Sequence, residues 1–165
     1  HKKIEMFYNE IEISLYEDDD NTDFELFLRF YDDNQDLDIY RTEWCIFAED
    51  LKIAGSIDAV FKNDDDTFTL YDWKRTKDLK YYSFDNKTGK YPFNLHQDCN
   101  YTKYCIQLNI YKAILEKYYN IEIKEMILLI CHPINDNYKK IVVPSMVNEI
   151  NKLFEERRKV IDSLF

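Results

Sequence analysis

Residues 51–78 read LKIAGSIDAVFKNDDDTFTLYDWKRTKD, and the rest of the chain is organised around this stretch. Apolar residues on both sides of the acidic turn at residues 63–66 predict two antiparallel strands. Asp58 lies among the apolar residues of the first strand, and Asp72 and Lys74 end the second. Because side chains two positions apart in a strand point the same way, Asp72 and Lys74 should share one face. Two carboxylates and an ammonium on adjacent strands suit a divalent-metal site with an activated water, whereas an ion pair between Asp58 and Lys74 at the sheet edge is the simpler interpretation.

The composition is that of a folded domain. The chain has 165 residues, of which 45% are hydrophobic and 16% aromatic, enough for a sizeable core. It contains two glycines and three prolines, which argues against linkers and low-complexity segments. No apolar run approaches the roughly 20 residues of a membrane span, so we expect no membrane partner. Since the chain opens on His1 and has no signal peptide, we expect residues 1–165 to be a single domain excised from a longer protein.

The four cysteines form no C-x-x-C pair, which makes a zinc site unexpected. We interpret them as buried, reduced thiols of an intracellular protein in a reducing compartment. They are Cys45, Cys99, Cys105 and Cys131.

The charge is unevenly distributed along the sequence. The formal net charge is −10, and residues 1–73 alone hold 21 acidic and 6 basic residues, a net of −15. Residues 74–103 hold seven basic and three acidic residues, a net of +4. For an anionic partner the distribution of charge matters more than its sum, and the basic segment directly follows Asp72.

Outside the central hairpin, apolar periodicity predicts further helices and strands. A strand at residues 41–48 would complete a three-stranded antiparallel meander, and Glu43 on it faces either the metal site or the surface, depending on register. The acidic residues 17–20 and 32–38 read as solvated loops. Together these elements predict an α/β (α+β) fold that contains this antiparallel meander. Helices are expected at residues 1–15, 23–30 and 101–119 and after Pro144 and Ser145, and further strands at residues 126–131 and 141–143.

The connection at residues 75–100 is too long for an ordinary loop, and such loops are usually functional or mobile. It interleaves lysines with the aromatic residues Tyr81, Tyr82, Phe84, Tyr91 and Phe93. Cations beside exposed aromatic rings suit a single strand of nucleic acid, with phosphates on the lysines and bases on the rings. The alternative is a loop pinned to the body by its aromatic residues. The candidate nucleic-acid-binding residues are Arg75, Lys77, Lys80, Tyr81, Tyr82, Lys87 and Lys90.

Three short motifs follow one another along the chain. They are Gly55-Ser56-Ile57-Asp58, Asp72-Trp73-Lys74 and, on the helix expected at residues 101–119, Gln107-x-x-x-Tyr111. This pattern resembles the RecB-like exonuclease branch of the PD-(D/E)XK nuclease superfamily, which reads G-x-x-D, D-x-K and Q-x-x-x-Y. That branch also carries an upstream helical histidine in a setting such as H-x-x-(I/L)-E, and this chain begins His1-Lys2-Lys3-Ile4-Glu5.

The resemblance implies a restriction-endonuclease-like fold, a mixed sheet flanked by helices. It also implies Mg²⁺- or Mn²⁺-dependent hydrolysis of DNA, at ends or single strands, in replication, repair or recombination. It implies that His1, Asp58, Asp72 and the main-chain carbonyl of Trp73 ligate the metal. It also implies that Lys74 orients or activates the attacking water. Gln107 and Tyr111 would support the site and touch the substrate backbone. A helicase, primase or other replication module is the fused or associated partner that it suggests.

Some members of this branch hold an iron–sulfur cluster on four cysteines, three of them grouped near the C-terminal end. The cysteines here lack that grouping, so we expect no cluster and a closer likeness to cluster-free members such as the mitochondrial genome maintenance exonucleases. Three alternatives remain open: a nuclease-fold domain that only binds DNA or a protein, an RNA-cleaving endonuclease on the same site, and a domain whose acidic N-terminal half binds a basic partner.

Overall fold

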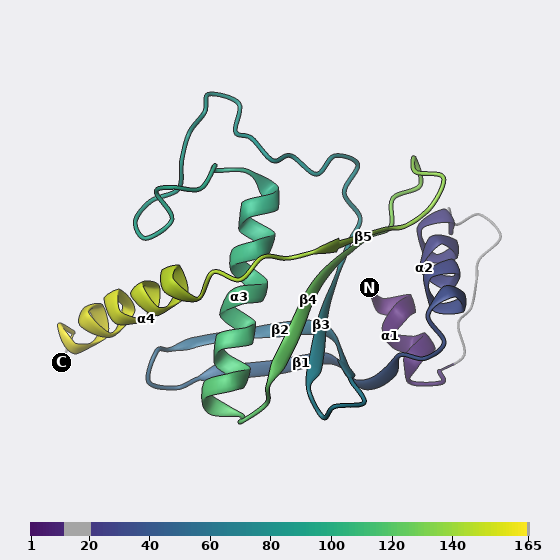
Figure 1. Cartoon of the computed structure of the whole chain (residues 1–165), viewed down its shortest axis with the longest axis horizontal. Helices are drawn as coiled ribbons and strands as arrows, with labels where there is room; N and C mark the ends of the chain where they lie inside the picture. The colour runs from purple at the N-terminus through teal and green to yellow at the C-terminus, as the bar shows by residue number, and fades with distance from the viewer. Residues whose placement is uncertain (12–20, 165) are drawn as a thin grey trace.

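The computed structural model describes residues 1–11 and 21–164, and within them the chain forms one five-stranded sheet and four α-helices (Figure 1). The strands lie in the sheet in the order β1-β2-β3-β4-β5. Their bounds are β1 Asp38–Ala48, β2 Ile53–Lys62, β3 Phe68–Lys74, β4 Ile123–Ile130 and β5 Lys139–Val142. The helices are α1 Lys2–Tyr8, α2 Thr22–Asp33, α3 Asn100–Tyr118 and α4 Val147–Asp162.

The sheet is mixed, as the sequence predicts. Strands β1, β2 and β3 form the expected antiparallel meander, with Val60 of β2 opposite Leu70 of β3. Strand β4 then pairs parallel to β3, with Leu128 opposite Asp72, and β5 pairs antiparallel to β4 at the edge. A parallel pair needs a crossover connection, and here residues 75–99 and helix α3 supply it. The mixed sheet with an antiparallel meander and flanking helices is therefore confirmed.

The helices cover the two faces of the sheet and divide the core into two layers (Figure 1). Helices α3 and α4 pack on one face, where Leu108 and Ile150 join residues of the strands. Helices α1 and α2 pack on the other, where Phe27 and Phe30 contact Trp73. This arrangement buries strand β3 on both faces, so polar groups on it lie in a largely dry environment.

Several predicted boundaries need correction. Helix α1 ends at Tyr8 rather than at residue 15, because Asn9 caps it and Glu10 follows with φ 55°. Helix α2 runs on to Asp33, past the expected end at Phe30, and the Asn34 side chain then donates a hydrogen bond to the Phe30 carbonyl at 2.7 Å. The acidic segment at residues 17–20 and the end of the first predicted helix lie outside the described residues.

The thiols also depart from expectation at one position. Cys99, Cys105 and Cys131 are buried and free, but Cys45 is free and exposed. Cys45 lies on the edge strand β1 next to Ile46. Because successive side chains of a strand point to opposite faces, Ile46 is buried in the core and Cys45 is exposed. Among the described helices, none combines the length and the apolarity needed to cross a membrane.

Candidate metal centre

Asp58 joins β2 to β3 where their backbone pairing stops. The last paired residues at this end are Ala59 and Tyr71, so Asp58 and Asp72 lie one position beyond them. There the Trp73 main-chain N–H donates a hydrogen bond to the Asp58 Oδ2 atom at 2.8 Å. His1, which begins helix α1, places its Nδ1 atom 3.4 Å from the same Asp58 oxygen. One carboxylate thus connects two strands and the first helix.

Asp72 and Lys74 share one face, as the strand alternation predicts. The Lys74 Nζ atom lies 2.7 Å from the Asp72 Oδ2 atom and 4.7 Å from the centre of the Tyr104 ring. The lysine therefore pairs with Asp72, and the simpler pairing with Asp58 that the sequence left open is not the one that forms. The same Asp72 oxygen is buried and has no hydrogen-bond partner among the described residues, so the lysine contact is a charge contact rather than an aligned hydrogen bond.

Burial is the largest influence on the pKa values of the two carboxyl groups Asp72 and Glu43. Asp72 is 3% exposed, and burial raises its pKa to about 6, with Lys74 opposing the rise and Asp58 adding to it. Burial and the Asp58 charge likewise raise the pKa of Glu43. The hydrogen bond with Asp58 raises the pKa of His1. Because the ionised forms of these carboxyl groups are disfavoured, a bound cation would stabilise them.

Glu43 faces the site. It lies on β1 directly across from Asp58, between the paired positions Thr42–Ala59 and Trp44–Ile57, and its φ of 44° is rare for a residue in a strand. Its Oε2 atom accepts a long hydrogen bond of 3.5 Å from the Ser56 hydroxyl. The sequence could not decide this orientation, because it depends on that local backbone irregularity.

The ligand atoms of His1, Glu43 and Asp58 all lie within 4.8 Å of one another. Two carboxylates and an imidazole suit Mg²⁺ or Mn²⁺, which prefer oxygen ligands and accept nitrogen. Asp72 lies outside this group of three and is coupled to it through the charge of Asp58. These candidate ligands share His1 and Asp58 with the set that the sequence predicts, and Glu43 is added to them.

The Gln107 and Tyr111 side chains contact one another on α3, where the Gln107 Nε2 atom donates a hydrogen bond to the Tyr111 hydroxyl at 2.9 Å. The Tyr111 ring lies over Gly55 of β2, so closely that a Cβ atom at Gly55 would lie 2.5 Å from the Tyr111 Cε1 atom. Glycine is needed here for close approach rather than for a turn. The sequence reasoning did not assign this role, although the presence of only two glycines in the chain was a usable signal.

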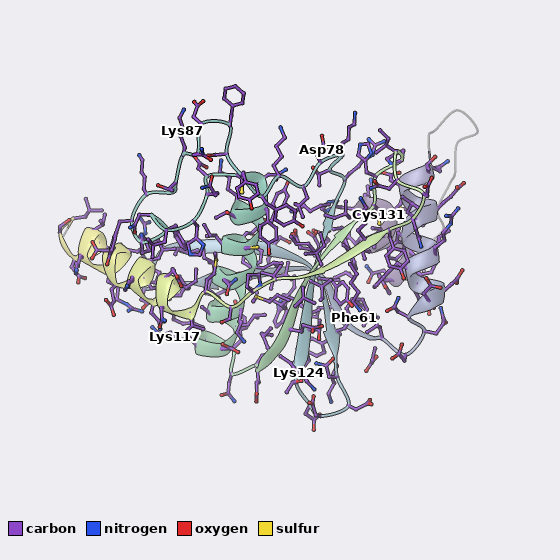
Figure 2. All side chains as sticks on the ribbon, turned by 45° about the horizontal axis from the view of Figure 1, so that its top comes forward. Phe61, Asp78, Lys87, Lys117, Lys124 and Cys131 are labelled. Atoms are coloured by element: carbon purple, nitrogen blue, oxygen red, sulfur yellow. The ribbon has the colours of Figure 1, made fainter. Side chains whose placement is uncertain are left out.

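A cavity of about 210 Å³ adjoins the centre, with His1, Trp73 and Lys74 in its wall. Arg75 also lines it, and its Nε atom lies 2.9 Å from the Asp23 Oδ2 atom. The other predicted nucleic-acid-binding residues are exposed on residues 75–99, where Figure 2 labels Lys87. These residues are Lys77, Lys80, Tyr81, Tyr82, Lys87 and Lys90.

Comparison with known proteins adds no relative to this description. No protein-family model matches the chain, and no curated protein matches it either.

Proposed function

We propose that this chain is a metal-dependent nuclease that hydrolyses DNA phosphodiester bonds. One observation carries the proposal: His1, Glu43 and Asp58 converge within 4.8 Å beside the buried pair of Asp72 and Lys74. The ordered motifs that resemble the RecB-like nucleases favour phosphodiester hydrolysis over other reactions of a metal site.

The residues present fit a hard divalent cation. His1, Glu43 and Asp58 would hold it with an imidazole nitrogen and carboxylate oxygens. The buried Asp72 oxygen, which has no hydrogen bond within the described residues, offers a further acceptor nearby. When bound, Mg²⁺ or Mn²⁺ offsets the negative charge that builds on the phosphoryl oxygens. Asp58 is already held in place by the Trp73 N–H and His1, so little reordering would be needed.

Lys74 is the residue we assign to the attacking water. Its ammonium is mostly buried, and the contact with Asp72 and the Tyr104 ring fixes its position. An N–H group of Lys74 can hold a water for in-line attack or donate to a phosphoryl oxygen as charge develops there. Asp72 balances the lysine charge in this dry position and is therefore a positioning residue as well as a candidate ligand.

Gln107 and Tyr111 lie on α3, where Tyr111 packs on Gly55 of β2, the strand that carries Asp58. Their hydrogen bond fixes the Tyr111 hydroxyl, and the contact with Gly55 sets the distance between α3 and β2. We assign them to support of the centre and to contact with the substrate backbone. The intact Asp58, Asp72 and Lys74 favour catalysis over a domain that only binds.

The test is incubation of the purified protein with end-labelled single-stranded DNA, duplex DNA and RNA, each with Mg²⁺, Mn²⁺ or EDTA. Lys74→Ala is compared with Lys124→Ala, which removes a surface lysine paired with Asp65 in a turn. We expect metal-dependent degradation of DNA that Lys74→Ala abolishes and Lys124→Ala retains. Degradation in EDTA, wild-type activity of Lys74→Ala, or no cleavage of any substrate with either metal would overturn the proposal.

A further inference from the structure

Residues 75–99, which we call the arm, leave the sheet directly after Lys74 and return at the start of α3 (Figure 1). The arm contains no helix or strand, only an isolated bridge between Thr88 and Gln97. Figure 2 shows it as a projecting loop with Asp78 near one end and Lys87 further out. It is thus a large surface feature that begins next to the candidate metal centre.

Polar side chains hold the arm in a defined shape. At its base, the Asn100 side chain donates to the Asp78 carbonyl at 3.0 Å and accepts from the Lys80 N–H at 2.8 Å. Further out, the Gln97 Oε1 atom accepts from both the N–H and the hydroxyl of Ser83, each at 3.1 Å. These bonds close the loop on itself without using an aromatic residue.

The arm is also anchored to the body. Phe93 is buried in the core layer of α3, and Gly89 lies so close that an added Cβ would be 2.8 Å from the Phe93 carbonyl oxygen. The His96 Nε2 atom lies 3.3 Å from the Glu149 Oε1 atom on α4. The sequence left open whether aromatic residues pin this loop, and Phe93 does.

Five other large apolar side chains on the arm are exposed. Tyr82 is 75% exposed, Phe84 102%, Tyr91 62% and Leu95 88%, while Tyr81 is 48% exposed and its ring contacts that of Tyr101. Burial of such a side chain would contribute roughly 1.5–3 kcal/mol, so their outward placement on a fixed loop is not explained by folding. Several large apolar side chains left exposed on one ordered segment are typical of a surface that binds a partner.

The charges on the arm identify the kind of partner. Lys77, Lys80 and Lys90 are exposed and make no ion pair with a described residue, and Lys87 has only a 3.4 Å contact with Asp85. The 73 residues before Lys74 carry a net charge of −15, whereas residues 74–103, which include the arm, carry a net charge of +4. Flat apolar rings beside cations match a polymer with stacked bases and phosphates.

We propose that the arm is a base-stacking surface for a single-stranded polynucleotide, with bases on Tyr82, Phe84 and Tyr91 and phosphates on Lys80 and Lys90. This inference rests on the proposed function, whose substrate it specifies. A duplex stacks its bases internally and cannot offer them to the rings, so the arm selects unpaired strands. Because the shape of the arm is already fixed, little ordering entropy is lost on binding.

Binding of labelled oligonucleotides by fluorescence anisotropy in Ca²⁺ tests the stacking. We compare Tyr82→Ala/Phe84→Ala with Phe47→Ala, which removes an exposed ring that contacts Tyr119 at the other end of α3. The double variant should bind oligothymidine about tenfold or more weakly, because each base–ring stack is worth about 1–3 kcal/mol, and should bind duplex DNA as before. Phe47→Ala should match the wild type. An unchanged affinity of the double variant, or an equal loss for duplex, would overturn the inference.

The same assay with oligouridine distinguishes RNA from DNA. The rings can stack on the bases of either polymer, so tighter binding of one of them shows which sugar the protein prefers. Lys80→Gln/Lys90→Gln tests the phosphate contacts. Its plot of log affinity against log salt concentration should be shallower by about 1.4, since each lost contact to a single strand contributes about 0.7. Lys124→Gln should leave the slope unchanged, and a slope unaltered in the arm variant would refute the contacts.

The two proposals fail in different ways. Strand binding that depends on the arm without cleavage would overturn the nuclease alone. Cleavage by a protein whose affinity for single strands is unchanged in the arm variants would overturn the stacking proposal alone. Thermal melts of the arm variants and of Phe47→Ala and Lys124→Gln should match the wild type, since the altered side chains are exposed.

Discussion

Asp72→Asn should stabilise the metal-free protein at neutral pH. The carboxylate is 3% exposed, and burial is the main reason that its pKa rises from the ordinary 3.8 to about 6. The folded protein thus binds this proton more tightly than the unfolded chain does. An ionised Asp72 therefore opposes folding, and an amide of the same shape removes that cost.

The sign and size follow from proton linkage. Below pH 4 the group is protonated in both states and its titration costs nothing. Between about pH 4 and pH 6 the unfolded chain loses the proton while the folded protein keeps it, so stability falls as pH rises. Above pH 6 the penalty is constant, and a rise of roughly 2 pH units corresponds to about 3 kcal/mol. In a chain of 165 residues this is roughly 6–12 °C in Tm.

The assay is thermal and urea unfolding of the wild type and Asp72→Asn in EDTA from pH 4 to pH 8, with the surface variant Asp64→Asn as control. The advantage of Asp72→Asn should be near zero at pH 4 and grow to its full value by about pH 6. Asp64→Asn should follow the wild type. An Asp72→Asn protein less stable than the wild type at pH 7.5, or an advantage that shrinks with rising pH, would refute the reasoning.

Four further predictions concern the same region. Lys74→Ala should keep the rise in Tm that Mn²⁺ causes while losing turnover, because Lys74 is not a ligand; loss of both would place it among the ligands. Glu43→Gln should weaken Mn²⁺ binding by roughly tenfold or more in calorimetry, since mutation even of a residue that only hydrogen-bonds to a metal ligand lowers metal affinity by that much. Unchanged binding would show that Glu43 is not a ligand. Mn²⁺ affinity should fall as pH drops, because a hydrogen bond with a neighbouring carboxylate raises the pKa of His1 and the proton competes with the metal; a flat profile would exclude His1 as a ligand. Gly55→Ala should cost about 1–3 kcal/mol in urea unfolding, because the added carbon would lie 2.5 Å from Tyr111, and a neutral effect would mean that α3 shifts freely.

Local periodicity accounts for the features that the sequence predicts well. The hairpin follows from apolar runs around an acidic turn, and the shared face of Asp72 and Lys74 follows from strand alternation. The hydrogen bond between Gln107 and Tyr111 follows from helical spacing. Each of these depends on a few neighbouring residues, for which the backbone geometry is the same in any protein.

Features that depend on distant or irregular contacts could not be predicted in this way. Glu43 faces the centre through an unusual φ in β1, and Gly55 is required by a ring on α3 more than 50 residues away. Strand alternation alone does not tell which of Cys45 and Ile46 faces the core, and here Ile46 does, which leaves Cys45 exposed. Apolar periodicity also cannot tell that Glu10 leaves the helical region and ends α1 early.

The closure of the arm by Asn100 has a consequence for how such a protein can diversify. A single side chain ties the two ends of the arm together, while parallel pairing fixes the register of β3 and β4 independently. Apart from the anchoring residues Phe93 and His96, the residues between these ends can lengthen, shorten or change character without altering β3 and β4. The exposed part of the arm is therefore a replaceable module, and under the proposed function its exchange offers a direct route to engineered variants that choose different substrates.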